Sequence, residues 1–235
     1  LLQNCNNFKD PGVQLYGGKI FSDLRDKIEE IFCKIPPPKP SVQQHHYRGL
    51  GSSVTTSAPT NMRTYMNAGG GCFDGNGMVM MNDDSMKQVK DLIKGDILYD
   101  GYQVKCIVKT IINGELEMVN VNDMLITPWH PIFYPKNGVY QWEFPVNLFD
   151  TNKVNIDYIY NIVLETGHVA TINNIQVVTL GHNFNDNQVV QHDYYGTDKV
   201  INDLKVFDGW EQGLVVISKP LVSRGKDGHV TGLSM

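Results

Sequence analysis

The stretch YIYNIVLETGHVATINNIQVVTLGHN, residues 158–183, decides the fold. It contains three short runs, YIYNIVLE, VATINN and IQVVTLG, which are rich in Val, Ile, Thr and Tyr. Similar runs extend back to residue 72, and Asn-Gly or Asp-Gly pairs at 76–77, 100–101, 113–114 and 137–138 separate them. Many short β-prone runs divided by such turn pairs are typical of an all-β domain. One stretch, residues 83–96, instead predicts a short helix that ends at Gly95.

A second helix is predicted near the start of the chain. Apolar residues recur at three- and four-residue intervals between residues 20 and 32, which indicates an amphipathic helix. Pro36 to Pro38 would end it. One such helix cannot bury its own apolar stripe, so we expect residues 1–40 to be the helical end of an upstream module. Residues 41–71 are rich in Ser, Thr, Gly and Gln, which is typical of a linker.

The composition of the chain argues against several classes of protein. The 235-residue chain has a net charge of −5 and no cluster of Lys and Arg, which argues against nucleic acid or an anionic membrane as a partner. No apolar run approaches the roughly 20 residues that a membrane-spanning helix needs. Because the chain begins with Leu1, we expect it to be a piece of a longer protein, so a missing signal peptide says little about its compartment. The location is left unknown, with the cytoplasm favoured. The cysteines are far apart and form no CxxC pair, which argues against a disulfide framework: Cys5, Cys33, Cys72 and Cys106.

Three motifs carry candidate chemistry, in a defined order along the chain. The first is a cysteine after three glycines, the second is a T-x-x-H motif, and the third is a late pair of histidines followed by asparagine. Together they comprise Cys72, Thr127, His130, His168, His182 and Asn183. Each motif alone is weak evidence, but the combination resembles the Hint family, which includes hedgehog autoprocessing domains and inteins.

The resemblance implies a domain plan and a fold. It covers residues 72–183, which we predict to be the Hint domain, and it leaves residues 184–235 as a C-terminal extension. The lead-in CKIPPPKPS and the trailing HDYYGTDKVINDL also resemble Hint domains that follow von Willebrand A-type domains in some microbial eukaryotes. The implied fold is an all-β horseshoe of short strands with two similar halves related by a pseudo-two-fold axis. Its start and end would lie side by side at the centre, which would bring Cys72 and His182 together with the T-x-x-H motif.

The resemblance also implies autocatalytic cleavage, performed once on the protein's own upstream segment and without a cofactor. Cys72 would attack the carbonyl of Gly71 and convert the peptide bond into a thioester, because a thiol is a strong nucleophile. The attacking side chain is adjacent to the carbonyl, so the reaction is intramolecular and loses little entropy in bringing the two groups together. Gly71 also has no β-carbon that would hinder the attack. Thr127 would hydrogen-bond the scissile amide. His130 would protonate the departing nitrogen, since imidazole exchanges protons near pH 7.

The late residues match the family in part. The resemblance implies that His168 assists proton transfer and that His182 belongs to the same site. Phe184 follows Asn183 and cannot accept an acyl group, so splicing is not expected. Cleavage after Asn183 stays open, although an asparagine in a polar loop needs no such role. Asn161 stands where many members have Asp, so we expect slow resolution of the thioester, or reliance on an external amine or thiol. That nucleophile would be a small molecule or an acceptor protein, and water also remains open.

Other functions are compatible with the same residues. A Cys–His hydrolase would use Cys72 and His130 on added substrates. An inert β-rich interaction module would bind partners through exposed aromatics of GVYQWEF or HDYYG. A zinc site would add Cys106 and His168 to the dyad, but their spacing fits no known ligand pattern, so no metal is expected.

Overall fold

The computed structural model describes residues 71–218 and 221–234, so the helix predicted within residues 1–40 and the linker up to residue 70 lie outside the described residues. The described elements are almost all strands, which confirms the prediction of an all-β domain. Among these residues, no helix is long and apolar enough to cross a membrane. The elements are β1 (Met78–Met80), β2 (Met86–Gln88), η3 (Val89–Asp91), β3 (Val104–Val121), β4 (Met124–Ile126), β5 (Ile132–Lys136), β6 (Val139–Glu143), η4 (Pro145–Asn147), β7 (Thr151–Leu164), β8 (Val169–Ile172), β9 (Ile175–Val178), α4 (Asp198–Leu204), β10 (Leu214–Ser218), β11 (Leu221–Arg224) and β12 (Val230–Ser234).

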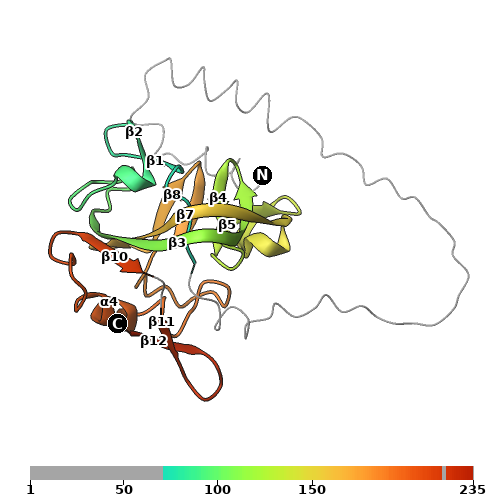
Figure 1. Cartoon of the computed structure of the whole chain (residues 1–235). Helices are drawn as coiled ribbons and strands as arrows, with labels where there is room; N and C mark the ends of the chain where they lie inside the picture. The colour runs from blue at the N-terminus through green and yellow to red at the C-terminus, as the bar shows by residue number, and fades with distance from the viewer. Residues whose placement is uncertain (1–70, 219–220, 235) are drawn as a thin grey trace, which may run out of the picture. The chain divides into compact units, whose positions relative to one another are not determined.

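Two long antiparallel strands, β3 and β7, organise the domain. Their register runs from Val104 opposite Leu164 to Val119 opposite Thr151. The edge strand β10 joins β3 in parallel, and β4 pairs antiparallel with the end of β3. A second sheet has the strand order β2-β1-β8-β9-β5-β6. Figure 1 shows the long pair crossing the middle of the domain, so residues on β7 reach elements from both ends of the sequence.

The first hydrophobic core joins the two sheets. Val79 and Ile172 from the six-stranded sheet belong to the same buried cluster as Ile107 and Ile162 from the long pair. The strands that contribute to it alternate buried and less buried residues, as in β8 with its pattern of two buried and two half-buried positions. This period of two is the pleat of a half-buried strand. The core therefore fixes which face of each strand turns inward, and hence where the polar residues of β7 point.

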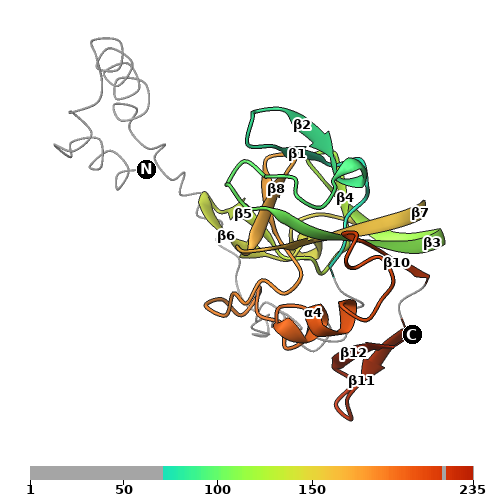
Figure 2. The same cartoon turned by 90° about the vertical axis from the view of Figure 1, so that its left-hand side faces the viewer.

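The predicted C-terminal extension contributes a second core. Tyr194, Leu204 and Val215 form a buried cluster with Cys106 of β3 and Val163 of β7. Figures 1 and 2 show α4 on the side of the long strand pair opposite to β1 and β2. Residues after position 183 thus pack directly on the two strands that organise the domain.

The helix predicted within residues 83–96 is wrong. The chain there forms β2, which pairs with β1, and a single 3-10 turn, η3. The backbone N–H groups of Val89 and Lys90 donate to the carbonyls of Gly77 and Gly75, at 2.9 and 3.0 Å, instead of bonding within a helix. Pairing with another segment therefore overrides the local helical pattern. Gly95 has a φ of +95° and lies in a turn rather than at a helix end.

Candidate functional site

The residues that follow the predicted nucleophile are held on both sides. Phe73 and Tyr160 of β7 exchange two backbone hydrogen bonds, with N···O distances of 3.0 and 2.8 Å. On the other side, the Asp74 N–H donates to the Leu125 carbonyl of β4 at 2.8 Å. Phe73 is buried, so the short segment after Cys72 lies as an extra strand between β7 and β4. This pairing gives the Gly71–Cys72 peptide bond, which is the predicted scissile bond, a defined position.

Thr127 lies directly at the amide of the predicted scissile bond. The Cys72 N–H donates to the Thr127 Oγ1 at 2.9 Å, and the Thr127 N–H donates to the Cys72 carbonyl at 2.9 Å. Thr127 comes just after β4, and the pairing of β4 with β3 fixes its backbone. The side chain and main chain of one residue therefore hold the Cys72 peptide groups.

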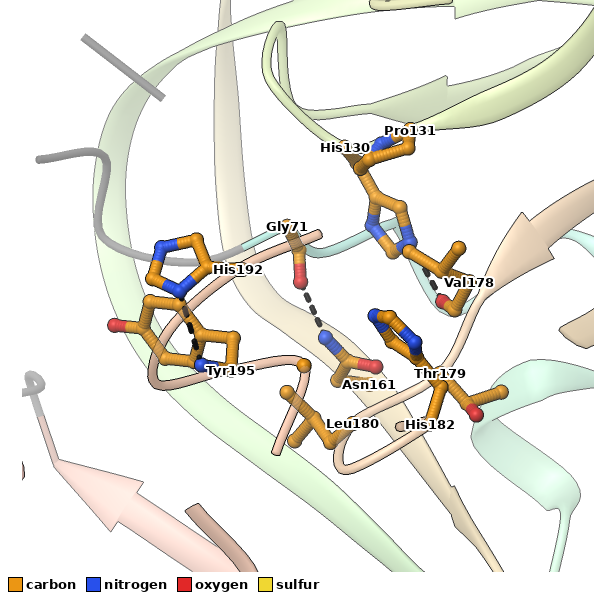
Figure 3. Close-up of a pocket in the computed structure, with 11 residues that line it drawn as sticks. Gly71, His130, Pro131, Asn161, Val178, Thr179, Leu180, His182, His192 and Tyr195 are labelled. Atoms are coloured by element: carbon orange, nitrogen blue, oxygen red, sulfur yellow. Dashed lines mark hydrogen bonds between the residues drawn. The ribbon is translucent and has the colours of Figure 1, made fainter. Parts of the chain in front are cut away.

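His130 lies beside Gly71, as Figure 3 shows. Its Nε2 is 2.9 Å from the Val178 carbonyl of β9. A carbonyl only accepts hydrogen bonds, so a neutral ring must carry its proton on Nε2 and leave a lone pair on Nδ1. Nδ1 has no hydrogen-bond partner among the described residues. A β-carbon added to Gly71 would lie only 2.7 Å from this Nδ1, so the free nitrogen is packed against the scissile glycine.

Burial keeps both members of the predicted dyad neutral. Burial lowers the pKa of His130 to about 4, and the backbone groups of Val178 and Cys72 offset this only in part. Cys72 has some accessible surface, but its thiol is enclosed, and this raises the thiol pKa to about 12 despite a hydrogen bond with Asn161. Near neutral pH the resting site therefore contains a thiol and an uncharged imidazole.

Asn161 contacts the scissile carbonyl itself. Its side-chain Nδ2 donates to the carbonyl oxygen of Gly71, drawn as a dashed line in Figure 3. The sequence marked this residue only as a departure from a family aspartate. Nothing in its spacing indicated a contact with a residue 90 positions earlier in the chain.

With the geometry established, comparisons with known proteins assign the family. A family model described as "Vint: Hint-domain" matches residues 71–232, and a model described as "VWA / Hh protein intein-like" matches residues 1–30. The chain belongs to the Hint-domain family. Both parts of the sequence resemblance, a Hint domain and a preceding region related to von Willebrand A-type proteins, are confirmed. Membership supports autoprocessing as the general activity of this chain.

Solved structures of inteins are also similar to this Hint domain. The gp41-1 intein is 13% identical, with a TM-score of 0.35, over 47% of this chain and 99% of that one. A DnaB intein from Synechocystis sp. PCC 6803 is 12% identical, with a TM-score of 0.34, over 47% of this chain and 99% of that one. No curated protein matches the chain.

The late histidines of the Hint domain occupy different environments. His182 is buried and lines the same pocket as Gly71 and His130. Its Nδ1 accepts the Phe184 N–H at 2.9 Å, and burial, reinforced by neighbouring histidines, lowers its pKa to about 4. His168 is exposed and does not line that pocket. Its Nδ1 contacts the His182 carbonyl and its ring lies 5.8 Å from that of Phe184. The structure therefore brings His182, and not His168, into the pocket that Gly71 lines.

Asn183 does not line the pocket that contains Gly71. Its side-chain amide donates to Asp198 at the start of α4 at 2.9 Å, and its backbone N–H donates to the Gly196 carbonyl at 2.8 Å. The residue is exposed and has a φ of 52°. Cyclisation would require the same amide nitrogen to leave Asp198 and turn toward its own carbonyl.

The segment after Asn183 supplies residues that sequence reasoning missed. His192, Tyr195 and Gly196 line the pocket with Gly71. His192 Nδ1 accepts the backbone N–H groups of Tyr194 and Tyr195, at 3.0 and 3.1 Å. Tyr194 is buried, so the expectation of exposed aromatics in HDYYG is wrong for this residue. The motif closes the site instead of forming a free surface.

The structure also bears on the GVYQWEF surface and on the alternative of a zinc site. In GVYQWEF, Val139 and Tyr140 are exposed, as the interaction-module hypothesis requires. Within residues 71–218 and 221–234, no group of three or more His, Cys, Asp or Glu residues could hold a metal ion. Cys106 belongs to the second core, where its Sγ lies 3.5 Å from the Ile107 carbonyl.

Proposed function

We propose that this Hint domain cleaves its own chain between Gly71 and Cys72 by an N-to-S acyl shift. The observation that carries the proposal is that two side chains contact the Gly71–Cys72 bond. The Cys72 N–H donates to Thr127, and His130 Nδ1 packs against Gly71. In this proposal residues 1–40 end an upstream module, residues 41–71 link it to the Hint domain of residues 72–183, and residues 184–235 form the extension. The substrate is the protein's own upstream segment.

The first step creates the nucleophile. The Cys72 thiol is protonated at rest, and His130 Nδ1 holds a lone pair. As Sγ attacks the Gly71 carbonyl carbon, His130 takes the thiol proton, and the carbonyl π electrons move to oxygen. The product is a tetrahedral intermediate with an oxyanion and an imidazolium. General base catalysis by a positioned imidazole is worth about 10²–10⁴-fold in rate.

The second step breaks the carbon–nitrogen bond. The oxyanion collapses, the bond between the Gly71 carbon and the Cys72 nitrogen breaks, and His130 returns the proton to that nitrogen. Because burial lowers the pKa of His130 to about 4, its imidazolium is a strong acid that gives up this proton readily. Thr127 keeps the nitrogen in place while it leaves. The products are a Gly71 thioester and the free amine of Cys72.

The third step resolves the thioester. Water would release the upstream segment as an acid, whereas a thiol or amine of a small molecule or an acceptor protein would take the acyl group. The Asn161 side chain already donates its hydrogen bond to the Gly71 carbonyl, so this donor is not free for the carbonyl of an added substrate. This favours self-processing over a hydrolase that acts on added substrates. Access for the resolving nucleophile is through the small pocket lined by His182 and Tyr195.

Mass spectrometry of the full chain over time tests the proposal. We expect fragments 1–71 and 72–235, faster formation with dithiothreitol or hydroxylamine, and a hydroxamate on Gly71 in the second case. Cys72→Ala should remain intact. An intact wild-type chain under every condition would contradict self-cleavage and favour the interaction module, for which Val139 and Tyr140 offer an exposed surface. Turnover of added thioesters or peptides without cleavage of the chain would favour the hydrolase.

A further inference from the structure

We propose that Asn161 is the oxyanion donor of the acyl shift and therefore a further catalytic residue of this domain. The proposal rests on the function proposed above. Its side-chain Nδ2 donates to the carbonyl oxygen of Gly71, which is the atom that becomes negative when Cys72 attacks. Figure 3 shows the carbonyl directed at the Asn161 amide. This contact is made to a reacting atom, before any substrate or cofactor has to bind.

The orientation of the Asn161 amide is fixed from both ends. Its Oδ1 accepts the backbone N–H of Ile162 at 2.8 Å, and an N–H cannot pair with the amide's NH₂ group. Nδ2 must therefore face Gly71, where the carbonyl oxygen can only accept. Asn161 is also buried, and it stands opposite Val108 in the register of β7 with β3. A donor held this way needs little reorganisation when charge develops.

The strand that carries Asn161 also holds the nucleophile. The preceding residue, Tyr160, exchanges the two backbone hydrogen bonds with Phe73, which follows Cys72. One strand thus fixes the donor and the scissile peptide relative to each other. Sites built on paired strands hold such geometry better than sites on loops.

The residues that line the pocket leave stabilisation of the oxyanion to a neutral hydrogen-bond donor. The described residues that line it include no Lys or Arg, so no cationic side chain there is available for the oxyanion. A preorganised hydrogen-bond donor in an enclosed site is worth about 10²–10³-fold in rate. The resemblance to a family in which many members have Asp here led us to expect slow resolution of the thioester, or reliance on an external amine or thiol. The contact assigns Asn161 a positive role instead, since a carboxylate would repel the oxyanion.

The Asn161→Asp variant distinguishes an oxyanion donor from a purely structural residue. In Asn161→Asp, a protonated carboxyl can still donate to Gly71 while its other oxygen accepts from Ile162. Burial would raise the pKa of that carboxyl, so the donor would be present at low pH and lost as pH rises. We expect cleavage about 10²–10³-fold slower than wild type at pH 8 and within about tenfold of it near pH 5. Asn161→Leu should be slowed by about the same large factor at every pH.

The assay is the rate of formation of fragment 72–235 from the full chain, with the same hydroxylamine concentration at each pH. The ratio of variant to wild type cancels the ionisation of the added hydroxylamine. The new carboxylate lies among titratable groups common to both proteins, namely Cys72, His130, His182, His192 and Tyr195, and would raise their pKa values. The Asn161→Leu ratio, measured at the same pH values, contains no such charge effect. Asn155→Asp is the matched control, because it adds the same charge at an exposed position of the same strand and should leave the rate unchanged.

Each outcome decides a separate point. If wild type is not cleaved, or Cys72→Ala still is, the proposed function itself fails. If wild type shows Cys72-dependent cleavage but Asn161→Leu is within threefold of it, the acyl shift stands and the oxyanion role is wrong. A slow Asn161→Asp whose ratio to wild type is flat from pH 5 to pH 8 also overturns the oxyanion role, because position 161 then acts only through structure.

Discussion

Replacing Gly71 by alanine should slow self-cleavage about 100-fold, although the carbonyls of the two residues are chemically alike. The added β-carbon would lie 2.5 Å from Cγ of His130 and 2.7 Å from its Nδ1. Carbon atoms in contact stay about 3.5–4.0 Å apart, so the ring would have to retreat by about 1 Å. The ring is buried and its Nε2 is held by the Val178 carbonyl, which leaves it no free path. A misplacement of about 1 Å costs on the order of 100-fold in rate, or about 2.7 kcal/mol.

The assay is a time course of fragments 1–71 and 72–235 by mass spectrometry, for Gly71→Ala beside wild type. Gly114→Ala is the matched control, because a β-carbon at Gly114 would approach nothing closer than 3.9 Å, the Ile112 carbonyl oxygen. Thermal unfolding midpoints of the three proteins would show whether a slow variant is still folded. Cleavage of Gly71→Ala within threefold of wild type would refute the reasoning, since His130 could not then be packed against the scissile glycine in the reacting state.

Three further predictions follow from the same contacts. Thr127→Val leaves the Cys72 N–H unpaired and should slow cleavage about 10- to 100-fold, whereas Thr127→Ser should stay within about threefold; equal rates for the two variants would exclude the hydroxyl contact. Asn183→Ala should leave the fragment pattern unchanged, because Asp198 holds the amide of Asn183; a wild-type fragment that ends at residue 183 and is lost in the variant would contradict this. The folded-state pKa values of His130 and His182 are about 4, below the ordinary value of 6.5. The unfolded chain therefore binds more protons between these values, and stability should fall as pH drops from 6.5 to 4, by up to about 3 kcal/mol per histidine. Urea unfolding at pH 7 and pH 4.5 would measure this, and His182→Gln should have a smaller loss than wild type.

The fold could be predicted from local patterns because those patterns agree with the tertiary pairing. The β-branched runs of residues 158–183 became the end of β7, β8 and β9, with burial alternating along β8 as expected for a pleated strand. The helix predicted within residues 83–96 failed for the opposite reason. Its apolar residues have helical spacing, but Val89 and Lys90 donate to the turn at residues 75–77, which no local pattern indicates.

The arrangement of side chains around the Gly71–Cys72 bond was predictable where the residues share a motif and unpredictable where only the folded geometry brings them together. Thr127 and His130 are close in sequence and reach the scissile bond together, as a T-x-x-H motif at the end of a strand suggests. His168 belongs to the same family pattern, yet it is exposed beside a different groove. Asn161 and Tyr195 reach the pocket only through long-range pairing and the packing of the C-terminal segment. Their residue types alone did not distinguish these two from other polar residues.

The neutrality of the resting site explains how a strong nucleophile can remain inside a stable fold. In this enclosed position, the attraction between a thiolate and an imidazolium would have to exceed the large free-energy cost of desolvating both charges. Burial instead keeps the Cys72 pKa near 12 and the His130 pKa near 4, so neither group is charged before reaction. In the proposed mechanism, charge then appears only along the reaction path, at the Gly71 oxygen and on the His130 ring. The dipoles that meet it, Asn161 at the oxygen and the Val178 carbonyl at the imidazolium, are already in place in the uncleaved chain. In the proposed mechanism the barrier therefore depends on how well strands β7 and β9 hold these dipoles, and this is why single-atom changes around Gly71 should have large effects on rate.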